Sequence, residues 1–285
     1  MYTIAQRNII LYFKDKKAVF FSIFNILIII CLYAVFLRTM MIQNFAGSEA
    51  LMDRWVLAGL VSITPISATL GAFAKMIQDQ ERGILKELMV APISRIQIVA
   101  GYVLSTAIIA FLMTLVMFIF AGIFLTLTQG HFLPFLAIVQ VIGVIVLIVL
   151  ATSSMILFLV SFAKTATSYS AISSIISTLI GFVAGIYVPM GSFSNTLQFL
   201  MKLFPLNHGT VLLRQLLLFS EGEGEQALYV GATERLNQVK GDLGIVFQLG
   251  YEPMSQMAHL LVLGFSILIF VFLSSKKLRK ELSNN

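Results

Sequence analysis

The chain has 285 residues, of which 59% are hydrophobic and only 11% are charged, and its formal net charge is +6. This composition excludes an ordinary soluble domain, in which about 25% of residues are charged. It predicts an all-α membrane protein, because an apolar run of roughly 20 residues is enough for one helical bilayer crossing. We therefore expect one transmembrane domain over residues 1–285, with six spans at 18–37, 55–77, 96–128, 134–162, 170–188 and 258–275.

The basic residues predict how these spans are oriented. Lys and Arg accumulate in the cytoplasmic loops of membrane proteins, largely regardless of the acidic residues. Thirteen of the 19 basic residues fall on the side of the two termini: Arg7, Lys14, Lys16, Lys17, Lys75, Arg82, Lys86, Arg95, Lys164, Lys276, Lys277, Arg279 and Lys280. We therefore expect a multi-pass protein of a bacterial-type plasma membrane with both termini in the cytoplasm. Anionic lipid at the inner leaflet explains the positive charge, and no nucleic-acid partner is predicted.

Residues 1–17, which precede the first span, have the pattern of an amphipathic helix. Ile9, Tyr12 and Phe13 recur at helical spacing, whereas Arg7 falls elsewhere around the helix. A helix of this kind lies in the plane of the membrane surface. A basic anchor without any further role explains the same residues equally well.

The connection between the second and third spans, residues 78–95, is a charged segment between two apolar runs. Ile84, Leu85 and Leu88 form one apolar face, which predicts a short amphipathic helix. Pro92 ends this helix, since residues before a proline avoid the α conformation. We expect the helix to lie in the cytoplasm and to contact an aqueous partner.

The third span has a defined start. Ser94, followed three residues later by Gln97, has the spacing of a capping box. A helix from Arg95 to Thr128 would be roughly 51 Å long, more than a hydrocarbon core of about 30 Å. Its cytoplasmic end is therefore expected to protrude from the membrane or to tilt.

The residues of this connection resemble a family signature. The run Glu81-Arg82-Gly83-Ile84-Leu85-Lys86-Glu87-Leu88, followed by Pro92-Ile93-Ser94-Arg95, is similar to the cytoplasmic signature of ABC-2 type permeases, the membrane subunits of type V ABC exporters. The resemblance extends to the N-terminal helix, the six spans and the long outer connection. It implies that an ABC ATP-binding subunit contacts the N-terminal helix and this loop, with Glu81, Arg82, Gly83, Lys86 and Glu87 as coupling residues. Without the resemblance, a solvated loop that obeys the positive-inside rule explains these charges.

The energy source is not expected in this chain. No GxxxxGK[ST] phosphate-binding loop occurs, and no soluble stretch is long enough for an ATPase domain. We therefore predict no enzymatic activity and no cofactor here, with ATP and Mg bound by the partner subunit. The cores of the third to sixth spans carry no ionisable side chain, which disfavours a gradient-driven carrier. The three histidines lack metal-ligand spacing, so no metal site is predicted.

Small residues in the fifth span predict a close helix contact. Ser173, Ser177, Gly181 and Gly185 recur at four-residue intervals, and such a stripe lets two helices approach closely. The second helix could belong to the same chain or to another subunit. The resemblance implies a second permease subunit, identical or paralogous, and hence a dimer interface on this stripe.

The same resemblance implies a central pathway between the two permease subunits. Spans 1, 2 and 5 would lie near the subunit interface. Phe24 and Asn25 of the first span, with Phe182 and Tyr187 of the fifth, are then the expected pathway residues.

Residues 190–257 form a connection too long for a turn. Residues 196–206 and 210–219 are apolar but too short to cross, and Asn207, His208 and Gly209 separate them. This pattern predicts a re-entrant or interfacial helical hairpin, which the resemblance places as a gate on the outer side. Arg214 is expected to reach the interface or to pair with an acid. Residues 220–250 have the composition of a flexible outer loop.

Taken as a set, these features predict the permease subunit of an ATP-driven exporter. The apolar pathway favours a hydrophobic or amphipathic substrate, a drug or a peptide, and it also suits a lipid-linked glycan. A sensor or scaffold that uses the same architecture without transport is the first alternative. A gradient-driven carrier is the second.

Overall fold

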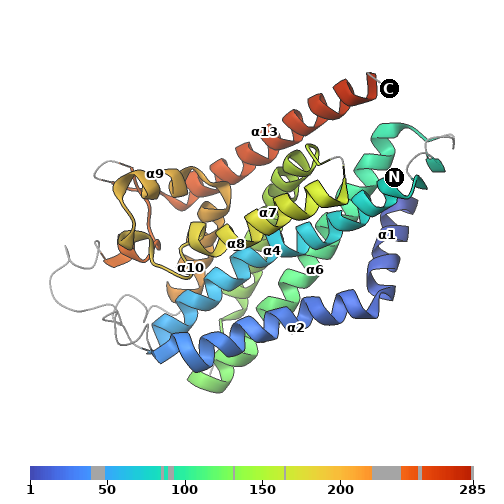
Figure 1. Ribbon diagram of the computed structural model, residues 1–285. Coiled ribbons are helices and arrows are strands. Elements are labelled where there is room, and N and C mark those ends of the chain that lie inside the picture. Colours follow the sequence, from blue (N-terminus) through green and yellow to red (C-terminus); the bar gives the residue numbers. More distant parts are fainter. Residues whose placement is uncertain are drawn as a thin grey trace.

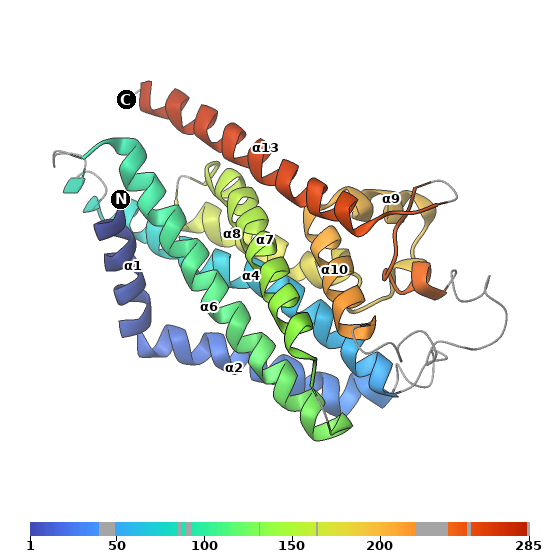
Figure 2. The same cartoon turned by 180° about the vertical axis from the view of Figure 1, so that it is seen from behind.

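The computed structural model describes residues 1–39, 49–84, 87–88, 93–130, 132–163, 165–219, 239–249 and 252–283. In chain order its elements are α1 (Tyr2–Lys14), α2 (Lys16–Leu32), the π-helical η1 (Tyr33–Leu37), α4 (Glu49–Glu81), α6 (Arg95–Gln129), α7 (Phe135–Val160), α8 (Ala166–Val183), the 3-10 turn η2 (Met190–Ser192), α9 (Asn195–Leu203), α10 (Pro205–Phe219), the two-residue strands β1 (Gln248–Leu249) and β2 (Glu252–Pro253), and α13 (Gln256–Ser283). Both chain termini lie at one end of the helix bundle, the terminal end, whereas α9 and α10 lie toward the opposite, distal end (Figure 1; Figure 2).

Five helices in the described part of the chain are long and apolar enough to cross a membrane, namely α4, α6, α7, α8 and α13. They coincide with the second to sixth expected spans. The first expected span, 18–37, is occupied by α2, which has 17 residues, and by η1 directly after it. The helical, membrane-spanning class is therefore confirmed, whereas a crossing by this first segment stays a prediction.

Of the two helices that flank the 78–95 connection, α4 ends later than expected, whereas α6 begins where it was expected. α4 continues to Glu81, so the first residues of the expected loop are helical. α6 begins at Arg95, where the Ser94 hydroxyl accepts from the Gln97 backbone N–H and the Gln97 side chain accepts from the Ser94 N–H. The predicted capping box is confirmed. Gly130 ends α6 in a left-handed conformation with φ of 80°.

The fifth span ends earlier than expected. α8 stops at Val183, five residues before the predicted end at 188, and Gly185 lies beyond it with φ of 62°. A left-handed φ suits glycine, which has no Cβ to clash with the backbone. Hydropathy gave no sign of this end, because the residues that follow are still apolar. Gly185 is therefore not part of a helical stripe with Ser173, Ser177 and Gly181.

The break between α9 and α10 also differs from the prediction. It falls at Phe204, which has an extended conformation, and Asn207, His208 and Gly209 lie inside α10. Asn207 is polar for a structural reason, because its side-chain amide donates to the carbonyl oxygens of Val183 at 2.8 Å and Met201 at 2.7 Å. The polar triplet thus joins helices and does not separate them.

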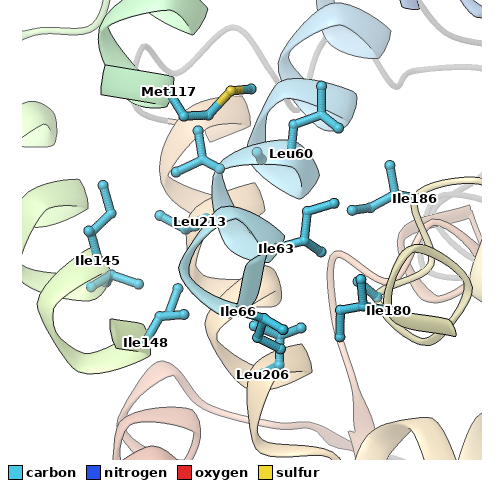
Figure 3. Packing of buried hydrophobic residues seen from close by; sticks show 14 of the residues in the cluster. Leu60, Ile63, Ile66, Met117, Ile145, Ile148, Ile180, Ile186, Leu206 and Leu213 are labelled. Atoms are coloured by element: carbon cyan, nitrogen blue, oxygen red, sulfur yellow. The ribbon is translucent and has the colours of Figure 1, made fainter. Parts of the chain in front are cut away.

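The core is organised around α4, which contacts α6, α7, α8 and α10. Figure 3 shows Leu60, Ile63 and Ile66 of α4 within a cluster of buried side chains from the surrounding elements. α10 lies alongside α4, where Leu206 and Leu213 are buried. α10 therefore packs directly on the central span.

Candidate coupling site

The N-terminal helix α1 packs on the terminal end of α6. Its buried residues are Ile4, Ala5 and Asn8. The contact is close, because a Cβ added at Gly101 of α6 would lie 2.8 Å from the Ile4 side chain. Phe13, expected on the apolar face, is 39% exposed. The helix is amphipathic as predicted, but the face that it buries in the protein is centred on Ile4 and Asn8.

A buried carboxylate holds α1, α4 and α6 together. Asp79, in the last turns of α4, has no solvent exposure, and its Oδ2 accepts from Arg7 of α1 at 3.0 Å and from the Tyr102 hydroxyl of α6 at 2.7 Å. Lys75, one turn earlier in α4, places its Nζ 3.3 Å from Oδ1. A carboxylate removed from water is stable only with such partners. Asp79 therefore fixes the N-terminal helix to the ends of both spans.

The residues of the predicted coupling loop lie directly beyond this carboxylate. Glu81 ends α4, and Arg82 and Gly83 form a turn in which Gly83 has φ of 77°. The Glu87 backbone N–H donates to the Gly83 carbonyl at 3.3 Å, which is a helix-type contact. Arg82 and Glu87 are exposed, so they are free to meet another protein. Lys86 lies outside the described residues, as do residues 85 and 89–92 of the same loop.

The described part of the loop packs on the same surface as α1. Ile4, Ile98 and Tyr102 form a small buried cluster, and Leu88 and Ile93 of the loop pack against it. The N-terminal helix, the loop and the ends of α4 and α6 therefore share one set of apolar contacts. The loop is therefore in direct contact with the elements that surround Asp79.

Glu81 connects this unit to a further span. Its Oε1 accepts a hydrogen bond of 2.5 Å from the backbone N–H of Ala166, the first residue of α8. Carboxylates are favourable at helix N-termini, where N–H groups lack partners within the helix. One turn further, the hydroxyl of Tyr169 in α8 donates to the Leu70 carbonyl of α4. Glu81, predicted as a contact to the ATP-binding subunit, thus binds inside its own chain.

Two residues of this site, Asp79 and Tyr102, were not predicted from the sequence. A signal was present in the spacing, since Lys75 and Asp79 are four residues apart at the end of an apolar run. Such a pair on one helix face indicates a carboxylate that needs compensation. Nothing in the sequence pairs Tyr102 or Arg7 with it, because both lie on other helices.

Some residues of the fifth span that were expected at a dimer interface or a pathway instead contact side chains of their own chain. A Cβ added at Gly181 would lie 2.1 Å from the Tyr187 ring, so Gly181 provides the space for Tyr187. Tyr187 in turn packs edge-on against Phe182, with ring centroids 5.3 Å apart. Ser177 is exposed and Ser173 partly buried. The predicted role of these residues in a dimer or a pathway stays a prediction.

The expected pathway residues of the first span lie on α2. Phe24 is 44% exposed and stacks on Phe20 with ring centroids 5.5 Å apart. The side chain of Asn25 lies outside the described part of the chain. Phe24 is therefore exposed in this chain, and its role in a pathway stays a prediction.

The prediction for Arg214 of α10 is wrong. Its side chain does not reach an interface, and it pairs with no acid among the described residues. It is buried and donates to four carbonyl oxygens: Gly185 and Leu243 at 2.9 Å, Gly244 at 3.2 Å and Ala184 at 3.4 Å. Its guanidinium also lies 4.3 Å from the Trp55 ring of α4. Burial lowers the pKa of Arg214 to about 9, so it stays protonated at neutral pH. Arg214 joins the end of α8 to α4.

Two histidines that are distant in sequence meet at the distal end. The Nδ1 atoms of His208 in α10 and His259 in α13 are 2.8 Å apart, and His208 Nε2 lies 2.9 Å from the Lys202 carbonyl oxygen. With Nε2–H donating to this carbonyl, His208 Nδ1 accepts from His259. Among the described residues no group of three potential ligands is found, so this pair has no metal-site geometry.

Comparison with known proteins assigns the family. No curated protein matches the chain. The family model for ABC-2 type transporters matches residues 1–218, which include α1, the loop after α4, and all elements through most of α10. The chain therefore belongs to the ABC-2 type transporter family, and it is a membrane-spanning transporter permease.

Proposed function

We propose that this chain is the permease subunit of an ATP-driven exporter, and that ATP-driven movement of a partner ATP-binding subunit is transmitted through the loop at 81–93. ATP and Mg would be bound by that partner, in keeping with a family of permeases that generally lack ATPase motifs. Both termini, and with them the docking face, would lie in the cytoplasm. The plasma membrane of a bacterial-type cell is the proposed location.

One observation carries this proposal: the loop, α1, α4, α6 and α8 are joined around Asp79 and Glu81. A partner that pushes on the exposed Arg82 and Glu87 would move the terminal ends of several spans at once. Arg214 would pass the movement of α4 and α8 to α10 at the distal end. The proposed gate is the helical pair α9 and α10.

The proposed assembly contains a second permease subunit, identical or paralogous. α8 is the span least covered by its own chain, with Ile175 60% and Leu179 52% exposed. A helix this open needs lipid or another subunit. We propose that the second permease covers it, with Phe24 and Phe182 beside the pathway. A hydrophobic or amphipathic substrate, a drug or a peptide, suits these apolar side chains.

The test is purification of the chain from its native host together with its ATP-binding subunit. Glu87→Lys reverses an exposed charge on the proposed docking face and is expected to abolish co-elution. Glu81→Ala removes the oxygen that accepts from the N-terminus of α8 but leaves the exposed Arg82 and Glu87 in place. It is expected to retain co-elution while ATP hydrolysis no longer responds to the permease.

The matched control is Glu49→Lys, which reverses an exposed acid at the distal end of α4. It should leave co-elution unchanged, because the ATP-binding subunit does not reach this end. Two results would overturn the proposal: no ATPase co-elutes with the wild type, or Glu49→Lys impairs co-elution as strongly as Glu87→Lys. The first result would favour a gradient-driven carrier or a scaffold.

A further inference from the structure

The distal end of the molecule contains a cavity of about 550 Å³ between α9, α10, the β1–β2 hairpin and the start of α13. This volume lies in the range of about 300–1,000 Å³ that is typical of ligand pockets. None of the coupling residues or the expected pathway residues lines it. The cavity is therefore separate from the site described above.

One wall of the cavity is amphipathic. Asn195, Gln198 and Lys202 of α9 follow each other at intervals of three and four residues, so they form a polar stripe along one helix face. Phe199 and Leu203 flank this stripe and also line the cavity. A ligand that matches this wall has both a polar group and an apolar body.

Lys202 determines the charge of the polar group. Its ammonium nitrogen lies 6.0 Å from the centre of the Phe247 ring, and no carboxylate of the described residues lines the cavity. The lysine backbone is held in place, because its carbonyl oxygen is bound by His208, which is itself paired with His259. A positioned cation in a cavity without described acids attracts an anionic group.

The surroundings of the cavity indicate lipid and not water. Leu200 and Leu203 of α9 are 55% and 62% exposed, and Met257 and Leu261 of α13 are 65% and 66% exposed. α13 begins here as a helix able to cross the membrane, so its first turns lie at the level of the lipid headgroups. Large exposed apolar side chains at this level contact acyl chains. The cavity thus opens where a phospholipid has its phosphate and the start of its chains.

We propose that this cavity binds one anionic phospholipid from the adjacent leaflet, with its phosphate at Lys202 and an acyl chain along Phe199, Leu203 and Val262. The bound lipid would stabilise α9 against α13 and so hold the distal helices in one arrangement. This inference depends on membrane insertion alone and is independent of which ATPase drives the protein.

The test measures lipid binding to the purified, delipidated full chain by native mass spectrometry. The probes are palmitoyl-oleoyl phosphatidylglycerol, the matching zwitterionic phosphatidylcholine, and glycerol 1-phosphate. The wild type should bind the first phosphatidylglycerol at least about tenfold more tightly than phosphatidylcholine, as expected for a hydrogen bond to a charged group. Lys202→Gln should reduce this preference to under about twofold, and Lys202→Arg should retain it.

Two further variants test whether the lipid binds in this cavity or elsewhere on the protein. Lys240→Gln is the matched control, because Lys240 also lies over a phenylalanine ring, that of Phe219, but does not line the cavity. Lys240→Gln should keep the full preference for phosphatidylglycerol over phosphatidylcholine. Val262→Phe fills the cavity and should weaken the first binding step of both lipids. The proposal is overturned if the wild type shows no preference, if Lys240→Gln loses as much as Lys202→Gln, or if glycerol 1-phosphate competes as well as the lipid.

Discussion

At the level of single residues, the buried carboxylate of Asp79 decides whether α1 stays attached. Arg7 and Lys75 are each about one-third exposed, whereas Asp79 has no exposure. When Asp79 is removed, the side chains of Arg7 and Lys75 can turn toward water. When one of these cations is removed, the buried Asp79 carboxylate cannot reach water. Leaving a charge buried without its partner is the more costly change.

We therefore predict that Arg7→Gln detaches α1 more than Asp79→Asn does. Each single variant should cost about 1–3 kcal/mol of the α1 contact. The double variant should cost less than the sum of the two, since neither partner is then left alone. Hydrogen exchange of α1 measures the contact. Additive losses in the double variant would show that the two side chains do not interact.

Arg214 offers a second residue-level prediction. Its planar fork donates to carbonyls of two segments and stacks on Trp55, which a lysine ammonium cannot reproduce. Arg214→Lys should lower the free energy of unfolding by about 2 kcal/mol or more. Trp55 is the only tryptophan, so its fluorescence reports thermal unfolding at this position.

Arg54→Lys is the control for this measurement. Arg54 is also on α4, but it is only partly buried and has Gln129 and the Leu217 carbonyl as acceptors. Arg54→Lys should lower the free energy of unfolding clearly less than Arg214→Lys does. Equal losses of stability in the two variants would mean that the burial of Arg214 adds nothing to its contribution to the free energy of unfolding.

His208 gives stability a pH dependence. Burial lowers the pKa of His208, although its hydrogen bond to the Lys202 carbonyl acts in the opposite direction. The unfolded chain therefore binds more protons than the folded one as the pH falls through about 6.5. Thermal stability should decline between pH 7.5 and 5.5, and His208→Gln should decline less. An equal decline would assign the effect to other groups.

At the level of elements, the turn after α8 carries a strong steric prediction. Gly181→Ala would push a methyl group into the Tyr187 ring and should cost about 1–3 kcal/mol. Gly143→Ala in α7 meets nothing within 4 Å and should be neutral or stabilising by up to about 1 kcal/mol. Thermal unfolding in detergent compares the two. A harmless Gly181→Ala would show that Tyr187 leaves this position readily.

The same elements show what could be predicted from the sequence. The expected runs for spans 2 to 6 each fall on a long helix, because apolar length is a property of the segment itself. The start of α6 was predicted because Ser94 and Gln97 act locally. The end of α8 and the break at Phe204 were not, since they depend on Tyr187 packing on Gly181 and on Asn207 binding the ends of two helices.

The coupling site shows the same limit. Charged residues of the loop were identified from their resemblance to a signature, but the partner of Glu81 lies on α8, and those of the unpredicted Asp79 lie on α1 and α6. The contact of Glu81 with a partner subunit stays a prediction, whereas the bond of its carboxylate to Ala166 of its own chain was not predicted. A contact between residues 85 positions apart leaves no trace in one sequence.

At the level of the whole molecule, a chain of contacts runs from one end to the other. Glu81 and Asp79 gather the terminal ends of α1, α4, α6 and α8, and Arg214 links α4 and the end of α8 to α10. We propose that force on the loop changes the distal helices in the assembled exporter, and not in the isolated chain.

The most direct test is the accessibility of a distal cysteine in the complex with the ATP-binding subunit. In a Cys31→Ser background, Thr196→Cys places a thiol at an exposed polar position of α9 that does not line the proposed lipid cavity, and a membrane-impermeant maleimide added from outside measures its labelling rate. ATP with vanadate should change this rate severalfold, and Glu81→Ala, which removes the acceptor for the Ala166 N–H, should abolish the change while leaving the basal rate intact. A labelling rate that nucleotide does not change in the intact complex, or a response that survives Glu81→Ala, would show that force on the loop does not act on the distal helices.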